Sequence, residues 1–271
     1  MGTNLSLAGK SIVITGGTGI IGASFIKSVC NAGADVGILG RNEKIATERA
    51  NEIVKQGGKA IPLIADVTNE EQLIAAREKM LQAFGKIDGL VNAAGGNIPE
   101  AVVQPDQDIF KLNMSAIQEA MNLNLFGSIL PTQVFGEAIK NNGSGSIVNI
   151  SSVTAHLAVT KVLGYSLGKA AIDCYTQWFA VELAKRFGDK IRMNSIVPGF
   201  VLTEQNKTLL TNEDGSLTER GHLIINKTPF NRFGTAQELE GALVWLLSDD
   251  SKFVTGSKIT VDGGFSVYSG V

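Results

Sequence analysis

The chain is poor in the residues that build disulfide frameworks and metal centres. Its 271 residues include only two cysteines and two histidines. Cys30 and Cys174 each stand alone, without a C-x-x-C pair or a histidine at ligand spacing. This pattern argues against a cysteine-rich scaffold and indicates no metal site. Because both cysteines fall in segments with helical apolar periodicity, we expect two buried, reduced thiols.

The chain also lacks a strong charge of either sign and a long apolar run. Its 24 Lys+Arg and 26 Asp+Glu residues give a net charge of −2, and the two signs are interspersed. This balance gives no electrostatic case for nucleic-acid binding. No apolar run approaches the roughly 18 residues that span a bilayer, and the first residues show no signal-peptide pattern. We therefore expect a soluble, cytoplasmic protein without nucleic acid or membrane as a partner.

Strand-like and helix-like segments alternate along the chain, with no linker, repeat or low-complexity tract between them. Nearly continuous apolar runs predict buried strands at 12–14, 35–39, 60–65, 89–92, 146–150, 192–197 and 258–261. Helical patterns separate them at 42–56, 70–84, 130–140, 167–187 and 236–247. This alternation predicts an α/β fold in one domain, residues 1–271. We expect a single doubly wound, Rossmann-like parallel sheet of about seven strands with helices on both faces.

Two segments interrupt the alternation. Residues 96–121 form a longer insertion in which 106–112 has the pattern of a short helix. Residues 203–229 are polar, and the sequence NEDGS at 212–216 predicts a turn. In doubly wound sheets, ligands bind outside the carboxyl ends of the strands, and these two segments follow strands there. We expect them to form the substrate side.

A glycine-rich turn opens the chain. Residues 11–22, SIVITGGTGIIG, join an apolar strand to a helical pattern. Strand, glycine turn and helix together bring backbone N–H groups and a helix N-terminus to a pyrophosphate. Glycine permits the tight turn and the close approach of the phosphate. The pattern predicts a dinucleotide site.

Ser152, Tyr165 and Lys169 form a candidate catalytic cluster. Tyr165 and Lys169 lie four residues apart, so on a helix they share one face, and Ser152 ends a strand-like run upstream. A phenol has a reference pKa of about 10, too high for proton exchange at neutral pH. Because a nearby ammonium lowers that value, the cluster predicts a hydride-transfer site with a lowered Tyr165 pKa.

These segments resemble the short-chain dehydrogenase/reductase family, and the resemblance covers nearly the whole chain. It rests on TGGTGIIG at 15–22, DV at 66–67, NAAG at 92–95, LNLFG at 123–127, the 13-residue interval from Ser152 to Tyr165, and PGFVLT at 198–203. One departure occurs: the family's turn usually has its middle glycine where Ile20 stands, and here Gly19 supplies it. We expect a local variant of the loop that keeps the cofactor.

The resemblance assigns roles to individual residues. It implies that Tyr165 exchanges the substrate proton, Ser152 binds the same oxygen, Lys169 lowers the Tyr165 pKa and binds the nicotinamide ribose, and Asn124 holds a relay water. It also implies a homotetramer. The cofactor residues that it implies are Gly16, Thr18, Gly19, Ile20, Ile21, Arg41, Asn42, Asp66, Val67, Asn92, Ala93, Gly95, Tyr165, Lys169, Pro198, Gly199, Val201 and Thr203.

The sequence leaves NAD(H) and NADP(H) both open. An NAD site favours an acidic residue about 20 residues after the glycine turn, to accept the ribose hydroxyls. Here the second strand ends in Gly40 and Arg41, with no acid at its tip, and Asp35 stands at its other end. Arg41 offers a cation for a 2′-phosphate, which favours NADP(H). The substrate resemblance described next favours NAD(H).

Three segments, at 199–206, 212–220 and 261–271, resemble the branch of the family that interconverts D-mannonate and D-fructuronate. This implies a small-molecule sugar acid, which needs a cation for its carboxylate and polar groups for its hydroxyls. Lys161 is the cation best placed by sequence. The polar candidates are Asn97, Ser152, His156, Gln205 and Asn206.

Other functions stay open at this point. Within enzymes they are another keto-gluconate or polyol reductase, such as a gluconate 5-dehydrogenase, and a 3-oxoacyl-carrier-protein reductase. The slightly acidic chain argues against the latter, because a carrier reductase needs basic residues to meet an acidic carrier. Outside enzymes, a nucleotide-sensing regulator could keep the fold without the chemistry. The complete set of Ser152, Tyr165, Lys169 and Asn124 argues against a regulator.

Overall fold

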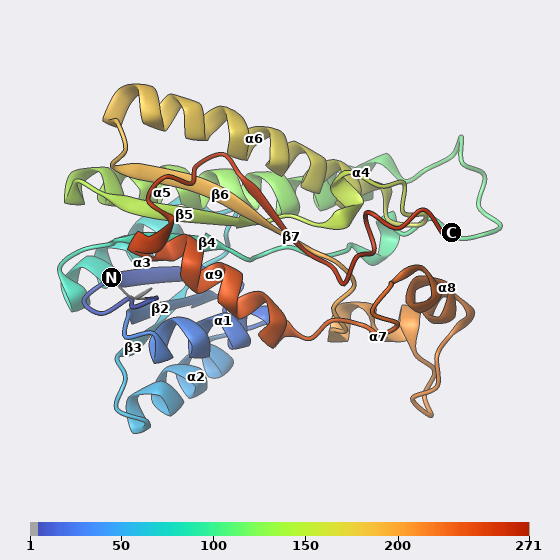
Figure 1. The fold of residues 1–271 in the computed structure, drawn as a ribbon, viewed down its shortest axis with the longest axis horizontal. Coiled ribbons are helices and arrows are strands. Elements are labelled where there is room, and N and C mark those ends of the chain that lie inside the picture. The colour runs from blue at the N-terminus through green and yellow to red at the C-terminus, as the bar shows by residue number, and fades with distance from the viewer. Residues whose placement is uncertain (1–4, 271) are drawn as a thin grey trace.

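The computed structural model describes residues 5–270, which are built around one seven-stranded sheet (Figure 1). The strands follow the order β3-β2-β1-β4-β5-β6-β7, and every neighbouring pair is parallel. They are β1 (Ser11–Thr15), β2 (Asp35–Gly40), β3 (Ala60–Ile64), β4 (Gly89–Asn92), β5 (Gly145–Ile150), β6 (Ile191–Pro198) and β7 (Lys258–Val261). The predicted α/β fold is confirmed, and each strand end lies within one residue of its predicted position.

Helices connect the strands and cover both faces of the sheet. The α-helices are α1 (Ile20–Asn31), α2 (Glu43–Lys55), α3 (Glu70–Phe84), α4 (Met114–Met121), α5 (Gly127–Asn142), α6 (Leu163–Phe187), α7 (Glu204–Leu210), α8 (Glu219–Lys227) and α9 (Glu240–Leu247). The shorter turns of helix are η1 (Pro99–Ala101), η2 (Asn122–Phe126, a π-helix), η3 (Val153–Ala155), η4 (Ala236–Leu239) and η5 (Asp249–Ser251).

Two apolar cores lie against the two faces of the sheet. On one face α1, α2 and α9 pack their buried side chains, such as Phe25, Ile53 and Leu243, against the strands. On the other face α3, α5 and α6 contribute a second cluster that includes Met80 and Phe135. The two layers are separated by the sheet in Figure 1. Both faces are therefore covered, which is why the strands read as continuous apolar runs.

Local signals set several helix ends. The Asn42 side chain accepts a hydrogen bond from the Ile45 N–H at 3.0 Å, which caps α2. Asn69 caps α3 in the same way. At the other ends, Gly85 and Gly143 terminate α3 and α5 in the left-handed region, at φ 77° and 90°. Asparagine caps and left-handed glycines are common helix boundaries, so these bounds follow from the sequence.

One helix prediction is wrong. Residues 106–112 form turns, and the helix in this insertion, α4, begins only at Met114. The Asp108 carboxylate accepts the Phe110 N–H at 2.9 Å, and Gln107 accepts the Gln104 N–H at 3.2 Å. Side-chain bonds of this kind offer the backbone an alternative to helical pairing. The predicted turn at 212–216 is present, with the Asn212 N–H donating to the Ser216 carbonyl.

The cysteine prediction is wrong for Cys174. Both cysteines are free, but Cys174 is exposed on α6, while Cys30 is partly buried against the core. On α6 the buried face is formed by residues such as Ile172 and Thr176, and Cys174 falls between them on the outer face. Helical periodicity showed that Cys174 belongs to a helix but not which face it occupies.

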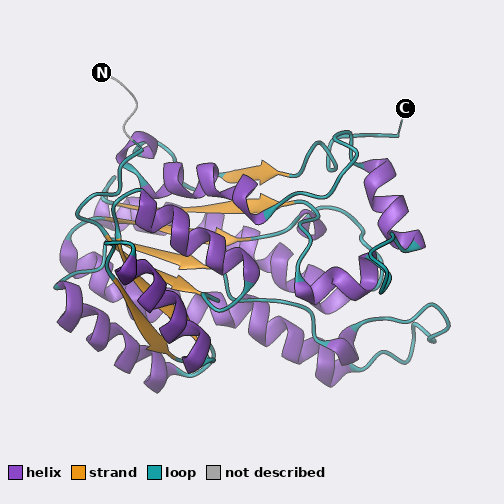
Figure 2. Ribbon diagram, turned by 90° about the horizontal axis from the view of Figure 1, so that it is seen from below, coloured by secondary structure: helices purple, strands orange, loops and turns teal. Residues whose placement is uncertain are grey.

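Because all strands are parallel, their carboxyl ends lie along one edge of the sheet. Figure 2 shows the strands pointing the same way, and Figure 1 places α7, α8 and the C-terminal stretch beyond that edge. Among residues 5–270, no helix combines the length and apolar character needed to cross a membrane.

Candidate active site

The glycine turn after β1 is shaped for close contact with a phosphate. Gly16 adopts φ 65°, and a Cβ there would come within 2.7 Å of the Ala93 carbonyl oxygen. A Cβ on Gly22 would overlap the Gly16 carbonyl oxygen. The N-cap of α1 is Gly19, which has no side chain to cap the first turn. The N–H groups of that turn are thus free of a side-chain cap, as an anion site at a helix N-terminus requires.

A cavity of about 600 Å³ follows this turn along the carboxyl edge of the sheet. Its size and glycine-rich wall fit a dinucleotide. The predicted cofactor residues in its wall are Gly16, Thr18, Gly19, Ile20, Ile21, Arg41, Asp66, Val67, Ala93, Gly95 and Thr203. Further wall residues not predicted are Gly22, Gly40, Arg49, Ala65, Ala94, Gly96, Ile98 and Leu123; Asn97, predicted for the substrate, also lies there.

Seven predicted cofactor residues do not line this cavity. Four of them line a smaller neighbouring cavity: Tyr165, Pro198, Gly199 and Val201. The other three, Asn42, Asn92 and Lys169, line neither cavity. Asn42 caps α2 as described above. Asn92 is buried, and its amide nitrogen donates to Thr132 Oγ1 at 2.9 Å and to Asn149 Oδ1 at 2.8 Å. The Asn92 amide therefore ties β4 to β5 and α5 from behind the cavity.

The adenosine end of the cavity carries two arginines. Arg41 is exposed, and its Nη1 lies 3.6 Å from Asp66 Oδ2. Burial alone would raise the pKa of Asp66, but hydrogen bonds from Thr68 and the Arg41 charge lower it overall. Arg49, on α2, donates to the carbonyl oxygens of Gly17 and Gly19. Arg49 thus fixes the glycine turn, a role for which its local sequence gives no signal.

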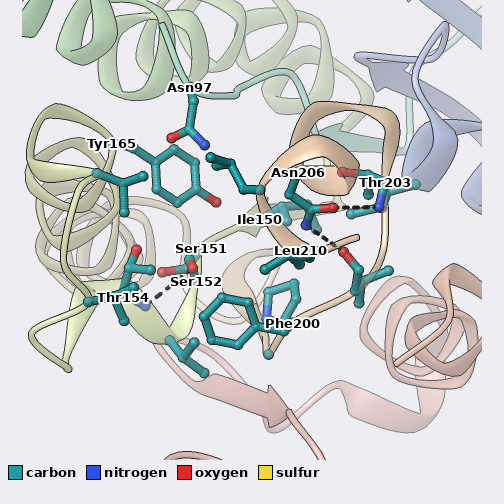
Figure 3. A pocket seen from close by; sticks show the side chains of 18 of the residues that line it. Asn97, Ile150, Ser151, Ser152, Thr154, Tyr165, Phe200, Thr203, Asn206 and Leu210 are labelled. Atoms are coloured by element: carbon teal, nitrogen blue, oxygen red, sulfur yellow. Dashed lines mark hydrogen bonds between the residues drawn. The ribbon is translucent and has the colours of Figure 1, made fainter. Parts of the chain in front are cut away.

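The catalytic candidates converge at the start of α6. Tyr165 and Lys169 share one face of the helix, with Lys169 Nζ 5.5 Å from the centre of the Tyr165 ring. Lys169 is buried, and its ammonium donates to the Ile150 carbonyl at 2.8 Å. Ser152, just after β5, borders the same cavity as Tyr165, and its side chain lowers the pKa of the Tyr165 phenol. Figure 3 shows the Tyr165 hydroxyl pointing into a cavity that Ser152 borders.

The pKa prediction for Tyr165 does not hold in this structure. Burial raises the pKa of the phenol, and the Ser152 side chain lowers it by less. The Lys169 ammonium lies by the ring and donates to the backbone. Burial also lowers the pKa of Lys169 to about 8, against the opposing charge of Asp173 one turn further along α6. Desolvation therefore outweighs the charge effect that the spacing of four suggested.

Asn124 lies in the π-helical turn η2, between α4 and α5. It is fully buried: its Oδ1 accepts the Gly96 N–H at 3.0 Å, and its Nδ2 donates to the carbonyls of Gly96 and Ala120 at 2.8 Å. A Cβ on Gly95 would come 2.7 Å from Asn124 Oδ1 and 3.1 Å from Lys169 Nζ. The structure thus places Asn124 beside Lys169, with only glycine between them. Single-turn π-helices of this kind often occur at functional sites.

A second cavity of about 160 Å³ opens over Tyr165 (Figure 3). It shares Ile21, Asn97 and Thr203 with the larger cavity, so the two cavities adjoin. Its wall also holds the predicted residues Pro198, Gly199 and Val201. Two buried hydroxyls in the wall, Ser151 Oγ and Thr154 Oγ1, have no hydrogen-bond partner among the described residues. The remainder is largely apolar, including Val159, Val162, Phe200, Leu209 and Leu210.

The predicted substrate residues separate into two groups. Asn97, Ser152 and Asn206 line the small cavity, although Asn206 also caps α7 by accepting the Thr203 N–H at 2.8 Å. Lys161 is not in its wall, and the Gln205 side chain lies outside the described part of the chain.

His156 is also not in the wall of the small cavity. Its Nε2 lies 2.7 Å from Asp173 Oδ2. Within residues 5–270 no group of three or more His, Cys, Asp or Glu side chains is arranged to hold a metal ion.

The cavity contains a cation that the sequence analysis missed. Arg220, on α8, lies in its wall and donates through Nη1 to Thr160 Oγ1 at 3.2 Å and through Nη2 to the Thr160 carbonyl at 3.0 Å. Burial lowers the pKa of its guanidinium. Arg220 is 55 residues after Tyr165 in the sequence, and no spacing rule connects the two.

Comparison with known proteins agrees with this geometry. The family model described as enoyl-(acyl carrier protein) reductase matches residues 18–266. An uncharacterized oxidoreductase, UxuB, of Bacillus subtilis is 40% identical over 98% of both chains.

Solved structures give the same result. The Haemophilus influenza protein provisionally named D-mannonate oxidoreductase, with bound NAD, has a TM-score of 0.90 at 40% identity, covering 98% of both chains. A gluconate 5-dehydrogenase from Burkholderia cenocepacia, in complex with NADP and tartrate, has a TM-score of 0.84 at 31% identity, covering 97% of both. Together with the glycine turn and the Tyr165 cluster, these matches show that the chain belongs to the short-chain dehydrogenase/reductase family of NAD(P)-dependent oxidoreductases.

Proposed function

We propose that this oxidoreductase interconverts D-mannonate and D-fructuronate. The observation that carries the proposal is the small cavity over Tyr165, which adjoins the cofactor cavity and presents unpaired hydroxyls and one arginine to a substrate. A short polyol chain ending in a carboxylate matches these groups, because hydroxyls pair with hydroxyls and a guanidinium pairs with a carboxylate. The relative provisionally named for D-mannonate supports the same substrate.

The side chains of the site support a proton and hydride transfer. A nicotinamide cofactor, held by the glycine turn and the wall of the larger cavity, would supply the hydride-transfer chemistry at the substrate carbon. Tyr165 then takes the proton from the substrate hydroxyl, or returns it to the carbonyl oxygen in the reverse direction. Ser152 donates a hydrogen bond to the same oxygen and stabilises negative charge that develops there.

Lys169 and Asn124 support Tyr165 from the buried side. The Lys169 ammonium stabilises the phenolate that forms when Tyr165 gives up its proton. The Asn124 side chain holds the Gly96 backbone through two hydrogen bonds, which fixes the chain next to Lys169. We propose that these four side chains are the catalytic group of the enzyme.

The cofactor is NAD(H) or NADP(H), as in the bound relatives. We propose that Arg41, which is exposed beside the adenosine end, favours NADP(H) by pairing with a 2′-phosphate. Arg41→Met should raise the KM for NADP+ about 10-fold and leave the KM for NAD+ within about twofold, because a phosphate contact is lost only in the first case. Equal effects on both cofactors would contradict this role.

The decisive experiment measures initial rates of D-mannonate oxidation with NAD+ and NADP+ offered separately to the purified protein. Turnover with D-mannonate at least 10-fold above that with D-gluconate is the expected result. Faster turnover with D-gluconate would move the assignment to a gluconate 5-dehydrogenase, the activity of another relative. Cofactor binding without turnover of either sugar acid would overturn the sugar-acid proposal.

We also propose that residues 1–271 form one domain and assemble as a homotetramer. The outer face of α6 supports a contact with a second copy, because Trp178 and Val181 are exposed there while Leu183 belongs to the core. Light scattering in solution tests this directly: a mass of four chains is expected, and a monomer would contradict it.

A further inference from the structure

Arg220 is the charged residue of the substrate cavity, and the sequence analysis assigned it no role. The cavity wall contains one residue with a formal charge among those described, and that residue is Arg220. No ion pair of the described residues involves it. A partly buried guanidinium without a carboxylate partner is a net positive charge in the wall of the cavity that Tyr165 also lines. Such a charge attracts an anion into the cavity.

The hydrogen bonds of Arg220 leave part of its guanidinium available. A guanidinium has five N–H donors, and Thr160 receives one from Nη1 and one from Nη2. These bonds hold the side chain against the segment before α6 without neutralising its charge, since a hydroxyl and a carbonyl are both uncharged. An arginine fixed in this way is preorganised for a carboxylate, which binds its remaining donors in a fork geometry.

The position of Arg220 connects both substrate-side insertions with the catalytic helix. Arg220 belongs to the insertion at 203–229, and the Thr160 segment leads directly into α6 with Tyr165. From the insertion at 96–121, the Val103 N–H donates to the Lys161 carbonyl at 2.8 Å. The two insertions therefore hold the same segment from different directions, and Arg220 is the contact that also faces the cavity.

We propose that Arg220 binds the carboxylate of the substrate and selects acids over neutral polyols. The identity of the sugar acid, D-mannonate, rests on the proposed function. The role of Arg220 applies to any small hydroxy acid that the cavity binds. Lys161, although adjacent to Thr160 and a cation, has no part in this selection because its side chain does not line the cavity.

The test measures binding without turnover. D-mannonate and the neutral polyol D-mannitol are titrated by calorimetry into the protein saturated with the reduced cofactor that it binds. For the unaltered protein, D-mannonate should bind at least 10-fold more tightly than D-mannitol. Arg220→Gln, which keeps hydrogen-bonding groups near Thr160 and removes the charge, should weaken D-mannonate binding roughly 10- to 100-fold and leave D-mannitol within about twofold.

Two controls separate charge from structure. Lys161→Gln removes the neighbouring cation and should leave both affinities unchanged. Thr160→Val removes one of the two bonds to Arg220 and should affect both ligands equally, if at all. If Arg220→Gln weakens both ligands alike, Arg220 is only a structural tether and the proposal is overturned.

Failure of the D-mannonate assignment gives a different result. The same titrations include D-gluconate and tartrate against D-glucitol and threitol, so that other hydroxy acids are compared with neutral polyols. A preference for any of these acids that disappears in Arg220→Gln supports the Arg220 proposal while excluding D-mannonate. No preference for an acid in any pair would overturn the Arg220 proposal, whatever cofactor affinity remains.

Discussion

The cofactor side and the substrate side of this molecule are built in different ways. The cofactor side uses backbone: glycines of one continuous turn, an uncapped helix N-terminus and the carboxyl ends of adjacent strands. The substrate side uses side chains from segments that are far apart in the sequence, such as Asn97, Thr154 and Arg220. A backbone site binds a group common to all dinucleotides, whereas a side-chain site distinguishes one substrate from another.

Tyr165 lines the small cavity that adjoins the cofactor cavity, and its substitution should separate substrate turnover from cofactor binding most strongly. Tyr165→Phe removes the hydroxyl and nothing else from the cavity wall. Turnover should fall roughly 10²- to 10⁴-fold, the range that a lost general acid–base group costs, because no other described residue of the small cavity supplies the proton. Cofactor affinity should stay within about twofold, since the glycine turn is untouched. Steady-state rates and cofactor titration measure the two effects.

A matched substitution exists on the same helix. Tyr175 is a largely buried tyrosine on α6 that lines neither cavity, and burial raises its pKa to about 12. Tyr175→Phe should leave turnover within about threefold of the unaltered protein. A comparable loss of turnover in both variants would show that the helix, and not the Tyr165 hydroxyl, was disturbed.

The second prediction breaks the cofactor side alone. In Gly22→Ala the new Cβ overlaps the Gly16 carbonyl oxygen, so the glycine turn must shift. Overpacking of this kind costs about 1 to 3 kcal/mol, and we expect cofactor affinity to fall about 10-fold or more with a lower Tm. Calorimetric titration and thermal unfolding measure both quantities.

Gly241→Ala is the control for that substitution. Gly241 lies in α9, and a Cβ there meets no atom within 4 Å. Alanine is the better helix former by about 0.5 to 1 kcal/mol, so Tm should stay the same or rise and cofactor affinity should not change. If Gly22→Ala binds the cofactor as tightly as the unaltered protein, the idea that close backbone packing fixes the shape of the glycine turn is wrong.

The difference between a cofactor side built from backbone and a substrate side built from distant side chains also explains which features the sequence could predict. The strands and the cofactor turn follow from patterns within 10 to 20 residues, so each predicted strand was found and most predicted cofactor residues line the cavity. Arg220 was missed because its place in the cavity that Tyr165 lines results from the path of the insertion, which no local pattern encodes. Lys161 is near Tyr165 in sequence, but it adopts a left-handed backbone conformation with φ 76°, and its side chain is not in the cavity wall.

The pKa of Tyr165 was mispredicted for a related reason. The spacing of Tyr165 and Lys169 showed that they share a helix face, but not how deeply that face is buried. Desolvation depends on the whole surrounding structure, and here it raises the pKa of Tyr165 and lowers that of Lys169. Side-chain spacing therefore predicted which groups meet, while their protonation required the fold.

The third prediction tests whether turnover depends on the positive charge of Lys169, on the buried side of Tyr165. Asp173 is buried one turn beyond Lys169, and its charge raises the Lys169 pKa while burial lowers it, to about 8. Removing the carboxylate in Asp173→Asn leaves burial unopposed, so Lys169 should lose its proton at a lower pH. If the ammonium is needed for turnover, the alkaline limit of kcat/KM must then move to lower pH. On the acid side of that limit, where Lys169 keeps its proton in both proteins, the rate should remain within about threefold of the unaltered protein.

A second variant distinguishes the charge of Asp173 from its contact with His156. His156→Gln keeps the carboxylate but removes the imidazole that lies 2.7 Å from Asp173 Oδ2. If charge is the cause, this variant should not move the alkaline limit to lower pH. An equal acid shift in both variants would instead show that the tie between the Ser152 segment and α6 controls the site. Asp173 would then influence turnover by fixing the geometry of the site, as the backbone does in the cofactor turn, and not through the charge of Lys169.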